Sequence, residues 1–174
     1  MTLTVEHRTP LLISAAVLAL ALRPVGWGAS IVTIAAGVLG AGARIEANDE
    51  ARTVAWLAVV ALGAGAFVVV RLQPGVVPLR TTALGVAASV VAAIAEELFF
   101  RRLLYARLER WGVAAAIAGS AMLFAGVHVP AYGLPALPVD LAAGLLFGWQ
   151  RWASGTWTAP AVTHVAANLI QVVR

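Results

Sequence analysis

The 174-residue chain contains no cysteine and no lysine. Without cysteine it can form neither disulfide bonds nor metal sites with thiolate ligands. Charged residues make up only 11% of the chain, whereas they make up about a quarter of an ordinary soluble domain. A nucleic-acid-binding protein would need a basic face on a soluble module, so we expect no nucleic-acid partner.

Apolar residues take the place of the missing charges, because 61% of the chain is hydrophobic. This composition predicts an integral membrane protein, and the length suits a single domain over residues 1–174. The N-terminal 24 residues resemble a signal peptide only loosely, because Glu6 and Arg8 precede the apolar run and a second apolar run follows at once. We therefore expect a retained first segment in the cell membrane, surrounded by the lipid bilayer.

Seven apolar runs separated by short turns predict seven helices, because backbone groups in lipid must find hydrogen-bond partners within their own segment. The runs span residues 10–22, 25–43, 54–70, 81–100, 111–129, 138–150 and 156–173. A full crossing needs about 20 residues, so whether 10–22 and 138–150 cross stays open, and Pro24 could merge the first two runs. The predicted fold is an all-α transmembrane bundle with six or seven membrane helices. Its N-terminal helices occupy about 10–70 and its core about 81–173.

The arginines predict the orientation of the bundle. If all seven runs cross, one side collects Arg8, Arg44, Arg52, Arg101, Arg102, Arg107, Arg110 and Arg151, and the other collects Arg23, Arg71, Arg80 and Arg174. Basic loops face the cytoplasm, so we predict a cytoplasmic N-terminus. We expect segment 101–110 to continue the fourth helix at the cytoplasmic interface, with Tyr105 and Trp111 as anchors.

Ionisable residues inside apolar segments are costly and usually functional. The chain has few: Glu96 and Glu97 end the fourth run, His128 ends the fifth, Asp140 begins the sixth and His164 lies in the seventh. Asn168 follows His164 by four residues, which places both on one face of a helix. At about 1.5 Å per residue, Glu97, His128, His164 and Asn168 lie roughly 14–26 Å from the nearest cytoplasmic turns, so they can share one layer.

The two glutamates need different partners. Glu97 and Arg101 are four residues apart, which suits a helix salt bridge, and such a pair on the helix surface is the alternative to a functional role. Glu96 points about 100° away and needs a partner on another helix, which His128 can supply. A carboxylate beside an imidazole suits a general base that activates water. His164 and Asn168 could stabilise a developing oxyanion, and Asp140 is interpreted as a helix cap or first-turn charge.

At these residues the sequence resembles the CAAX-prenyl-protease and bacteriocin-processing (CPBP) family of intramembrane proteases. The matching motifs are Glu96-Glu97-Leu98-Phe99-Phe100-Arg101, Phe124-Ala125-Gly126-Val127-His128 and His164-Val165-Ala166-Ala167-Asn168. Between them the family has a helix with small residues at four-residue spacing, which Asp140, Gly144 and Gly148 resemble. The two glycines would also allow close helix packing.

The resemblance implies an endopeptidase that hydrolyses a peptide bond in a membrane-anchored protein or peptide tail. It implies Glu96 as the general base, His128 as its partner, and His164 with Asn168 as the oxyanion-stabilising pair. Glu97 and Arg101 would support the site. The glutamate-type mechanism needs no metal and no cofactor.

Three alternatives remain from the residues themselves. Glu96, His128 and His164 together could form a zinc site with an open position, although the chain lacks the His-Glu-x-x-His motif. The same residues could relay protons in a small transporter, but the two halves show no internal repeat. A non-catalytic scaffold or immunity protein would not need all of these polar residues together.

Overall fold

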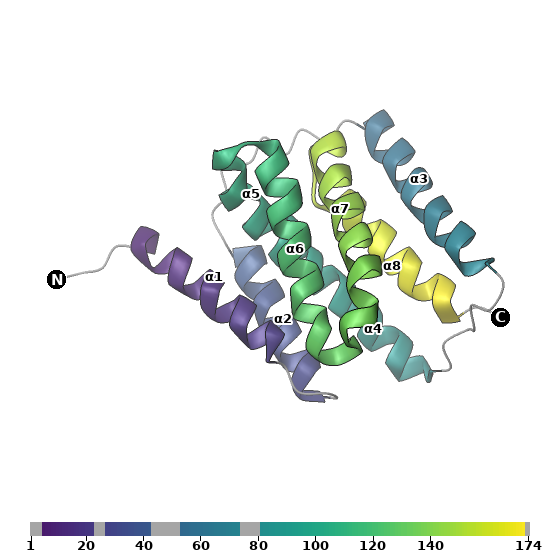
Figure 1. Cartoon of the computed structure of the whole chain (residues 1–174), viewed down its shortest axis with the longest axis horizontal. Coiled ribbons are helices and arrows are strands. Elements are labelled where there is room, and N and C mark those ends of the chain that lie inside the picture. Colours follow the sequence, from purple (N-terminus) through teal and green to yellow (C-terminus); the bar gives the residue numbers. More distant parts are fainter. Residues whose placement is uncertain (1–4, 23–26, 43–52, 74–80, 173–174) are drawn as a thin grey trace.

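The computed structural model describes residues 5–22, 27–42, 53–73 and 81–172, and all regular structure in these ranges is helical (Figure 1). The main helices are α1 (Val5–Ala21), α2 (Trp27–Gly42), α3 (Thr53–Arg71), α4 (Ala83–Glu97), α6 (Val113–Tyr132), α7 (Leu137–Ser154) and α8 (Thr158–Val172). Between α4 and α6 lie η1 (Leu98–Leu104), α5 (Tyr105–Leu108) and η2 (Glu109–Trp111), and η3 (Leu134–Ala136) precedes α7. Each predicted apolar run overlaps one main helix, which confirms the all-α bundle. The junction at Pro24 lies outside the described residues.

Local sequence signals explain where the site-bearing helices begin and end. Thr82 is the N-cap of α4, because its hydroxyl accepts a hydrogen bond from the backbone N–H of Gly85 at 3.1 Å. Gly112 and Gly133 flank α6 with φ angles of 99° and 80°, a region that favours glycine. The helices that carry the motifs therefore have defined starts and stops.

The helices that carry the motifs pack against one another in the middle of the bundle. α6 and α7 lie side by side and are joined by the short turn that contains η3 (Figure 1). α4 packs between α2 and α8, while α3 packs against α8 and α7, and α1 against α6 and α2. This arrangement brings α4, α6, α7 and α8 around one interior region.

Glycines allow these helices to approach closely. A Cβ atom at Gly144 would lie 2.9 Å from Cα of Ala121, and one at Gly148 would lie 3.2 Å from Cα of Ile117. The predicted close packing through these two glycines is confirmed, and α6 is the helix that they meet. On the other side, a Cβ at Gly40 would lie 2.2 Å from the carbonyl oxygen of Leu98, so α2 presses against the start of η1.

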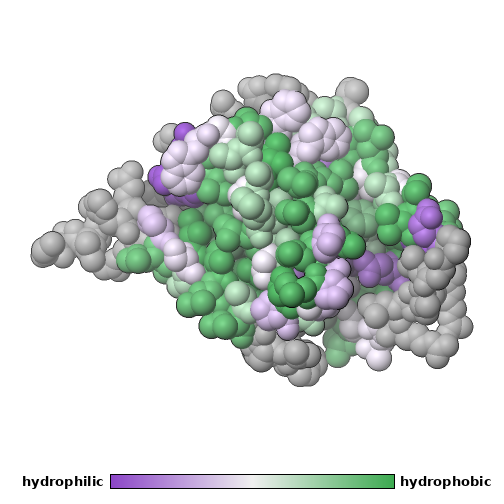
Figure 2. All heavy atoms as spheres, in the orientation of Figure 1, coloured by the Kyte–Doolittle hydropathy of each residue, from purple (hydrophilic) through white to green (hydrophobic). Residues whose placement is uncertain are grey.

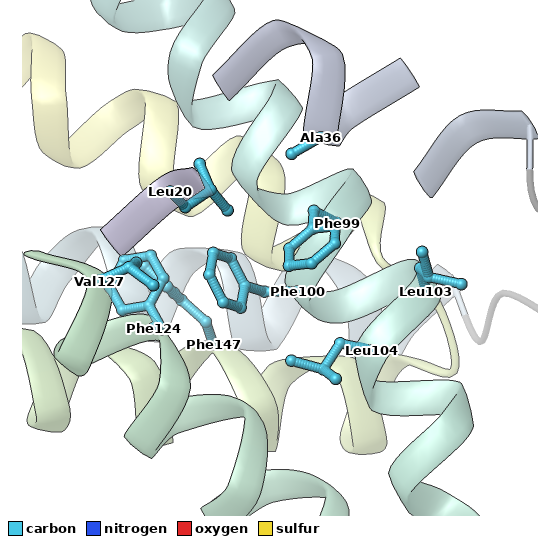
Figure 3. Close-up of a cluster of buried hydrophobic side chains, with 9 residues drawn as sticks. All are labelled: Leu20, Ala36, Phe99, Phe100, Leu103, Leu104, Phe124, Val127 and Phe147. Atoms are coloured by element: carbon cyan, nitrogen blue, oxygen red, sulfur yellow. The ribbon is translucent and has the colours of Figure 1, made fainter. Parts of the chain in front are cut away.

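A cluster of buried apolar side chains holds the interior together (Figure 3). It combines aromatic rings from three elements: Phe100 packs edge-on against Phe124 at 5.4 Å between centroids, and Phe124 packs edge-on against Phe147 at 6.1 Å. The other members are Leu20, Ala36, Phe99, Leu103, Leu104 and Val127. The chain thus concentrates four of its five phenylalanines at the junction of η1, α6 and α7.

The outer surface of the bundle is apolar, as Figure 2 shows for one face. Large hydrophobic side chains are exposed on all seven main helices, among them Leu11, Val38, Leu62, Leu84, Met122, Val139 and Val162. Within the described residues, two helical stretches are long and apolar enough to cross a membrane: Ala83–Trp111 and Val113–Tyr132. Pro10–Ala21, Ile31–Gly42 and Ala55–Arg71 are shorter apolar helices.

One expectation for the fourth helix is wrong. Tyr105 does not anchor the helix at an interface, because only 1% of its surface is exposed and it packs inside the bundle. The helix continues as predicted to Trp111, which is 62% exposed. The reason for the difference is that segment 98–105 lies between α2 and α6 rather than on the outside.

Candidate active site

The acidic pair lies where the α-helix widens into a π-helix. α4 ends at Glu97, and Leu98–Leu104 form π-helical turns, as the hydrogen bond from the N–H of Tyr105 to the carbonyl of Phe100 shows. Most of this segment is buried, namely Phe99, Phe100, Arg101, Leu103 and Leu104. π-helical turns occur often at functional sites, because the additional residue changes which side chains face inward. Apolar periodicity predicted a plain helix here, and we see no sequence signal that would have revealed the wider turn.

Glu97 contacts two side chains rather than one. Its Oε2 atom lies 3.3 Å from Nε of Arg101, and its Oε1 atom lies 2.9 Å from Nδ1 of His164. The side chains of Glu97 and Arg101 are fully buried, so the surface salt bridge considered from the sequence is wrong. The contact with His164 was not expected, because the sequence indicated Glu96 as the glutamate that meets the later helices.

Arg101 is held by aromatic rings and by a backbone carbonyl. Its guanidinium carbon lies 4.6 Å from the ring centroid of Phe124 and 5.3 Å from that of Phe147. Its Nη2 atom donates a hydrogen bond of 3.1 Å to the carbonyl oxygen of Gly144. Arg101 therefore connects η1 to both α6 and α7, and it fixes the position of the Glu97 carboxylate that it pairs with.

Glu96 and His128 face each other, as the sequence predicted. Oε2 of Glu96 lies 3.7 Å from Nε2 of His128, and both side chains are almost completely buried. Nδ1 of His128 lies 2.7 Å from the carbonyl oxygen of Phe124. A carbonyl oxygen can only accept, so Nδ1 carries a proton and Nε2 is the nitrogen directed at Glu96.

His164 lies between the Glu97 carboxylate and the ring of Phe147. The two rings stack at 5.0 Å between centroids, and Nδ1 donates to Glu97. Asn168, one turn later on α8, donates through Nδ2 to the carbonyl oxygen of Ser89 on α4 at 3.2 Å. Because an amide NH₂ has two N–H groups, Asn168 keeps a second donor.

Asp140 is closer to the site than the sequence indicated. The N-cap of α7 is Ala136, so the helix-cap interpretation of Asp140 is wrong, while its place in the first turn is confirmed. Its electrostatic neighbours are His128, Glu96 and His164. The sequence indicated Asp140 but not its neighbours, because these depend on how α7 lies against α6.

The residues named in the zinc alternative lie in two different pairs of side chains. Across the described residues, no group of three or more His, Cys, Asp or Glu side chains is placed to hold one metal ion. His164 turns Nδ1 to Glu97, whereas His128 turns Nε2 to Glu96. The side chains thus form two adjacent pairs, Glu96 with His128 and Glu97 with His164.

The comparison with protein families gives one match. Residues 78–170 match the model of a family described as type II CAAX prenyl endopeptidase Rce1-like. This range covers more than half of the chain and contains every candidate site residue named above. No curated protein and no solved structure gives a significant match to the chain.

Proposed function

Because the chain belongs to the type II CAAX prenyl endopeptidase Rce1-like family of membrane proteases, we propose that it cleaves membrane-anchored protein or peptide tails by a glutamate-activated water. This agrees with the CPBP resemblance of the sequence. The observation that carries the proposal is the buried juxtaposition of Glu96 and His128, whose facing atoms lie 3.7 Å apart. Two groups at this distance can both reach one water molecule.

Glu96 is the proposed general base. Its carboxylate takes a proton from the water while the resulting hydroxide attacks the carbonyl carbon of the scissile peptide bond. The same proton then passes to the amide nitrogen, the C–N bond breaks, and a new carboxylic acid and amine are released. No covalent enzyme intermediate forms and no step requires a metal.

His164 and Asn168 are the proposed oxyanion-stabilising groups. Nδ1 of His164 already donates to Glu97 at 2.9 Å, so only the protonated ring offers a second N–H, at Nε2, to the substrate. The hydrogen bond to Glu97 fixes the orientation of the His164 ring. The second N–H of Asn168, on the same face of α8, is the other donor. One such donor contributes about 10²–10³ in rate in a typical oxyanion site.

The family description guides the choice of test substrates. The family description names a CAAX prenyl endopeptidase, so a farnesylated CAAX peptide is the first probe. A reporter anchored by a single apolar helix without a prenyl group is the second. Cleavage of either places the reaction at the membrane, and the ratio of the two rates tells whether the lipid group is recognised.

The first prediction concerns Glu96. In proteoliposomes containing the purified protein, Glu96→Gln should cleave these reporters about 10²–10⁴-fold more slowly than the wild type, because glutamine cannot accept the proton. Glu109→Gln, which changes an exposed carboxylate outside the site, is the matched control and should keep the wild-type rate.

Substrate discovery can be combined with the same variants. Substrates can be identified without choosing a probe in advance. They are the membrane proteins that gain a new terminus in cells expressing the wild type but not in cells expressing Glu96→Gln. Full processing by Glu96→Gln would contradict the mechanism. Loss of wild-type activity after chelation, restored by zinc, would favour a metalloprotease instead.

A further inference from the structure

Three aromatic rings line one face of α6 and lead from the interior of the bundle to the end of the helix. Phe124, His128 and Tyr132 are spaced four residues apart, so they share one face of α6. The ring centroids of Phe124 and His128 lie 4.5 Å apart. Those of His128 and Tyr132 lie 5.8 Å apart, with ring planes only 12° from parallel. Both distances are typical of aromatic rings in contact, so the His128 ring touches a ring on the turn before it and a ring on the turn after it.

The exposure of these three residues rises steeply towards the end of α6. Phe124 is 3% exposed and His128 is 7% exposed, whereas Tyr132, the last residue of the helix, is 66% exposed. Glu96, which faces His128, is buried as deeply as this histidine. On the interior side, Phe124 packs against the fully buried Arg101. Along this face of α6, Tyr132 is therefore the residue that separates the buried pair from the outside of the bundle.

The turn that carries Tyr132 is held by fewer backbone hydrogen bonds than the turns before it. Pro130 has no N–H, so it cannot donate to the carbonyl oxygen of Gly126, four residues earlier. The N–H of Gly133 donates to the carbonyl oxygen of Val129 at 2.7 Å and closes the helix. The last turn can therefore shift more easily than the rest of α6, and the Tyr132 ring can shift with it.

We propose that Tyr132 covers His128 in the free protein and contacts the substrate beside the scissile bond when a substrate is bound. Glu96 and His128 are both almost completely buried, so a peptide bond reaches them only after a covering side chain has moved. The tyrosine ring is a rigid apolar surface with a polar tip, so it can exchange its contact with His128 for one with the substrate at little cost in conformational entropy. The substrate then approaches from the end of α6. The substrate contact rests on the proposed function, whereas the covering of His128 does not.

The covering of His128 can be measured without an activity assay. Diethyl pyrocarbonate adds to the unprotonated nitrogen of an accessible imidazole, and mass spectrometry of peptides distinguishes His128 from His7 and His164. In micelles, Tyr132→Ala should raise the rate of modification of His128 about 2–10-fold, the factor that one stacked pair of rings contributes to an equilibrium. Tyr132→Phe keeps the ring and should keep the wild-type rate.

Leu134→Ala is the matched control for this measurement. Leu134 is similarly exposed, in the turn that follows α6, but it has no ring to stack on His128, so the rate should stay at the wild-type value. An unchanged rate in Tyr132→Ala, or in Tyr132→Leu if the first variant does not fold, would overturn the proposal. An equal increase in Leu134→Ala would also overturn it, because it would show a loosened turn and not an uncovered ring.

The substrate contact is tested by photo-cross-linking in proteoliposomes. p-Benzoylphenylalanine at position 132, introduced into the slow Glu96→Gln variant, should cross-link to the reporter residues that flank the scissile bond. The same amino acid at Trp111, just before α6, or at Leu169, exposed beside Asn168 on α8, should not cross-link to these residues. A tyrosine that only anchors the helix at the membrane interface would produce neither this cross-link nor the change in modification of His128.

The two measurements distinguish a failure of this proposal from a failure of the proposed function. Cleavage by the wild type without a cross-link from position 132, or with cross-links from Leu169 instead, would overturn the proposed approach of the substrate. If the wild type cleaves no reporter while Tyr132→Ala uncovers His128, the protease function fails and the covering of His128 is supported.

Discussion

At the scale of single residues, the adjacent glutamates Glu96 and Glu97 have different partners. Glu96 faces His128, while Glu97 joins Arg101 and His164. The pairing of Glu97 with Arg101 could be predicted, because four residues along a helix bring side chains to the same face. The contact between Glu97 and His164 could not, because it joins residues 67 positions apart.

A prediction at this scale concerns the buried ion pair. Arg101→Met should lower the free energy of unfolding by about 3–5 kcal/mol, because it leaves the fully buried Glu97 carboxylate without its permanent cation. The double variant Glu97→Gln/Arg101→Met should recover much of this stability, because it removes both charges, but it should not recover activity. Denaturant titration in micelles measures the stability, and a loss below 1 kcal/mol in Arg101→Met would contradict the assigned role.

At the scale of elements, the site is assembled where helices approach through small residues and where one helix changes its pitch. Gly144 lets α7 lie against Ala121 of α6. The carbonyl oxygen of Gly144 accepts a hydrogen bond from Arg101. The four-residue spacing of glycines predicted close packing, but not the partner helix. The π-helical turns of η1 were not predictable from periodicity, because the run around them is almost uniformly apolar and a shift of the helical phase leaves no trace in it.

Gly144→Ala tests this packing. The added Cβ would meet the backbone of Ala121 at 2.9 Å, so α6 and α7 must separate and the acceptor for Arg101 moves. We expect a loss of about 1–3 kcal/mol in stability together with reduced activity. Gly126→Ala is the matched control on α6: a Cβ there has no neighbour within 4 Å, so helix propensity should leave stability equal or raise it by about 0.5–1 kcal/mol. Equal effects of the two changes in a stability assay would contradict the packing.

At the scale of the whole molecule, the exposed apolar surface and the family place the protein in a membrane. The helices of the bundle could be predicted because long apolar runs have few alternatives in lipid. The composition does not determine how many of these helices cross the membrane. The orientation of the bundle is a prediction from the positions of the arginines.

The absence of cysteine makes this orientation directly testable. Single variants Gln73→Cys and Arg107→Cys place one thiol near each end of the helical stretch Ala83–Trp111, at exposed positions. In intact cells a membrane-impermeant maleimide should label Gln73→Cys but not Arg107→Cys, which should react only after permeabilisation. The reverse pattern would invert the predicted orientation, and labelling of both from outside would show that this stretch does not separate the two positions.

The sequence by itself determined the helices, the membrane environment, the polar residues and the spacings that place Glu97 with Arg101 and His164 with Asn168. These follow from the period of the α-helix, which is a local property. Only the tertiary structure decided that Glu97 and not Glu96 meets His164, that Arg101 is enclosed by Phe124 and Phe147, and that Asp140 lies near His128. These contacts depend on the rotation and height of one helix against another. Glycine contacts and the π-helical turns of η1 set this rotation and height. No periodic pattern in the sequence encodes them.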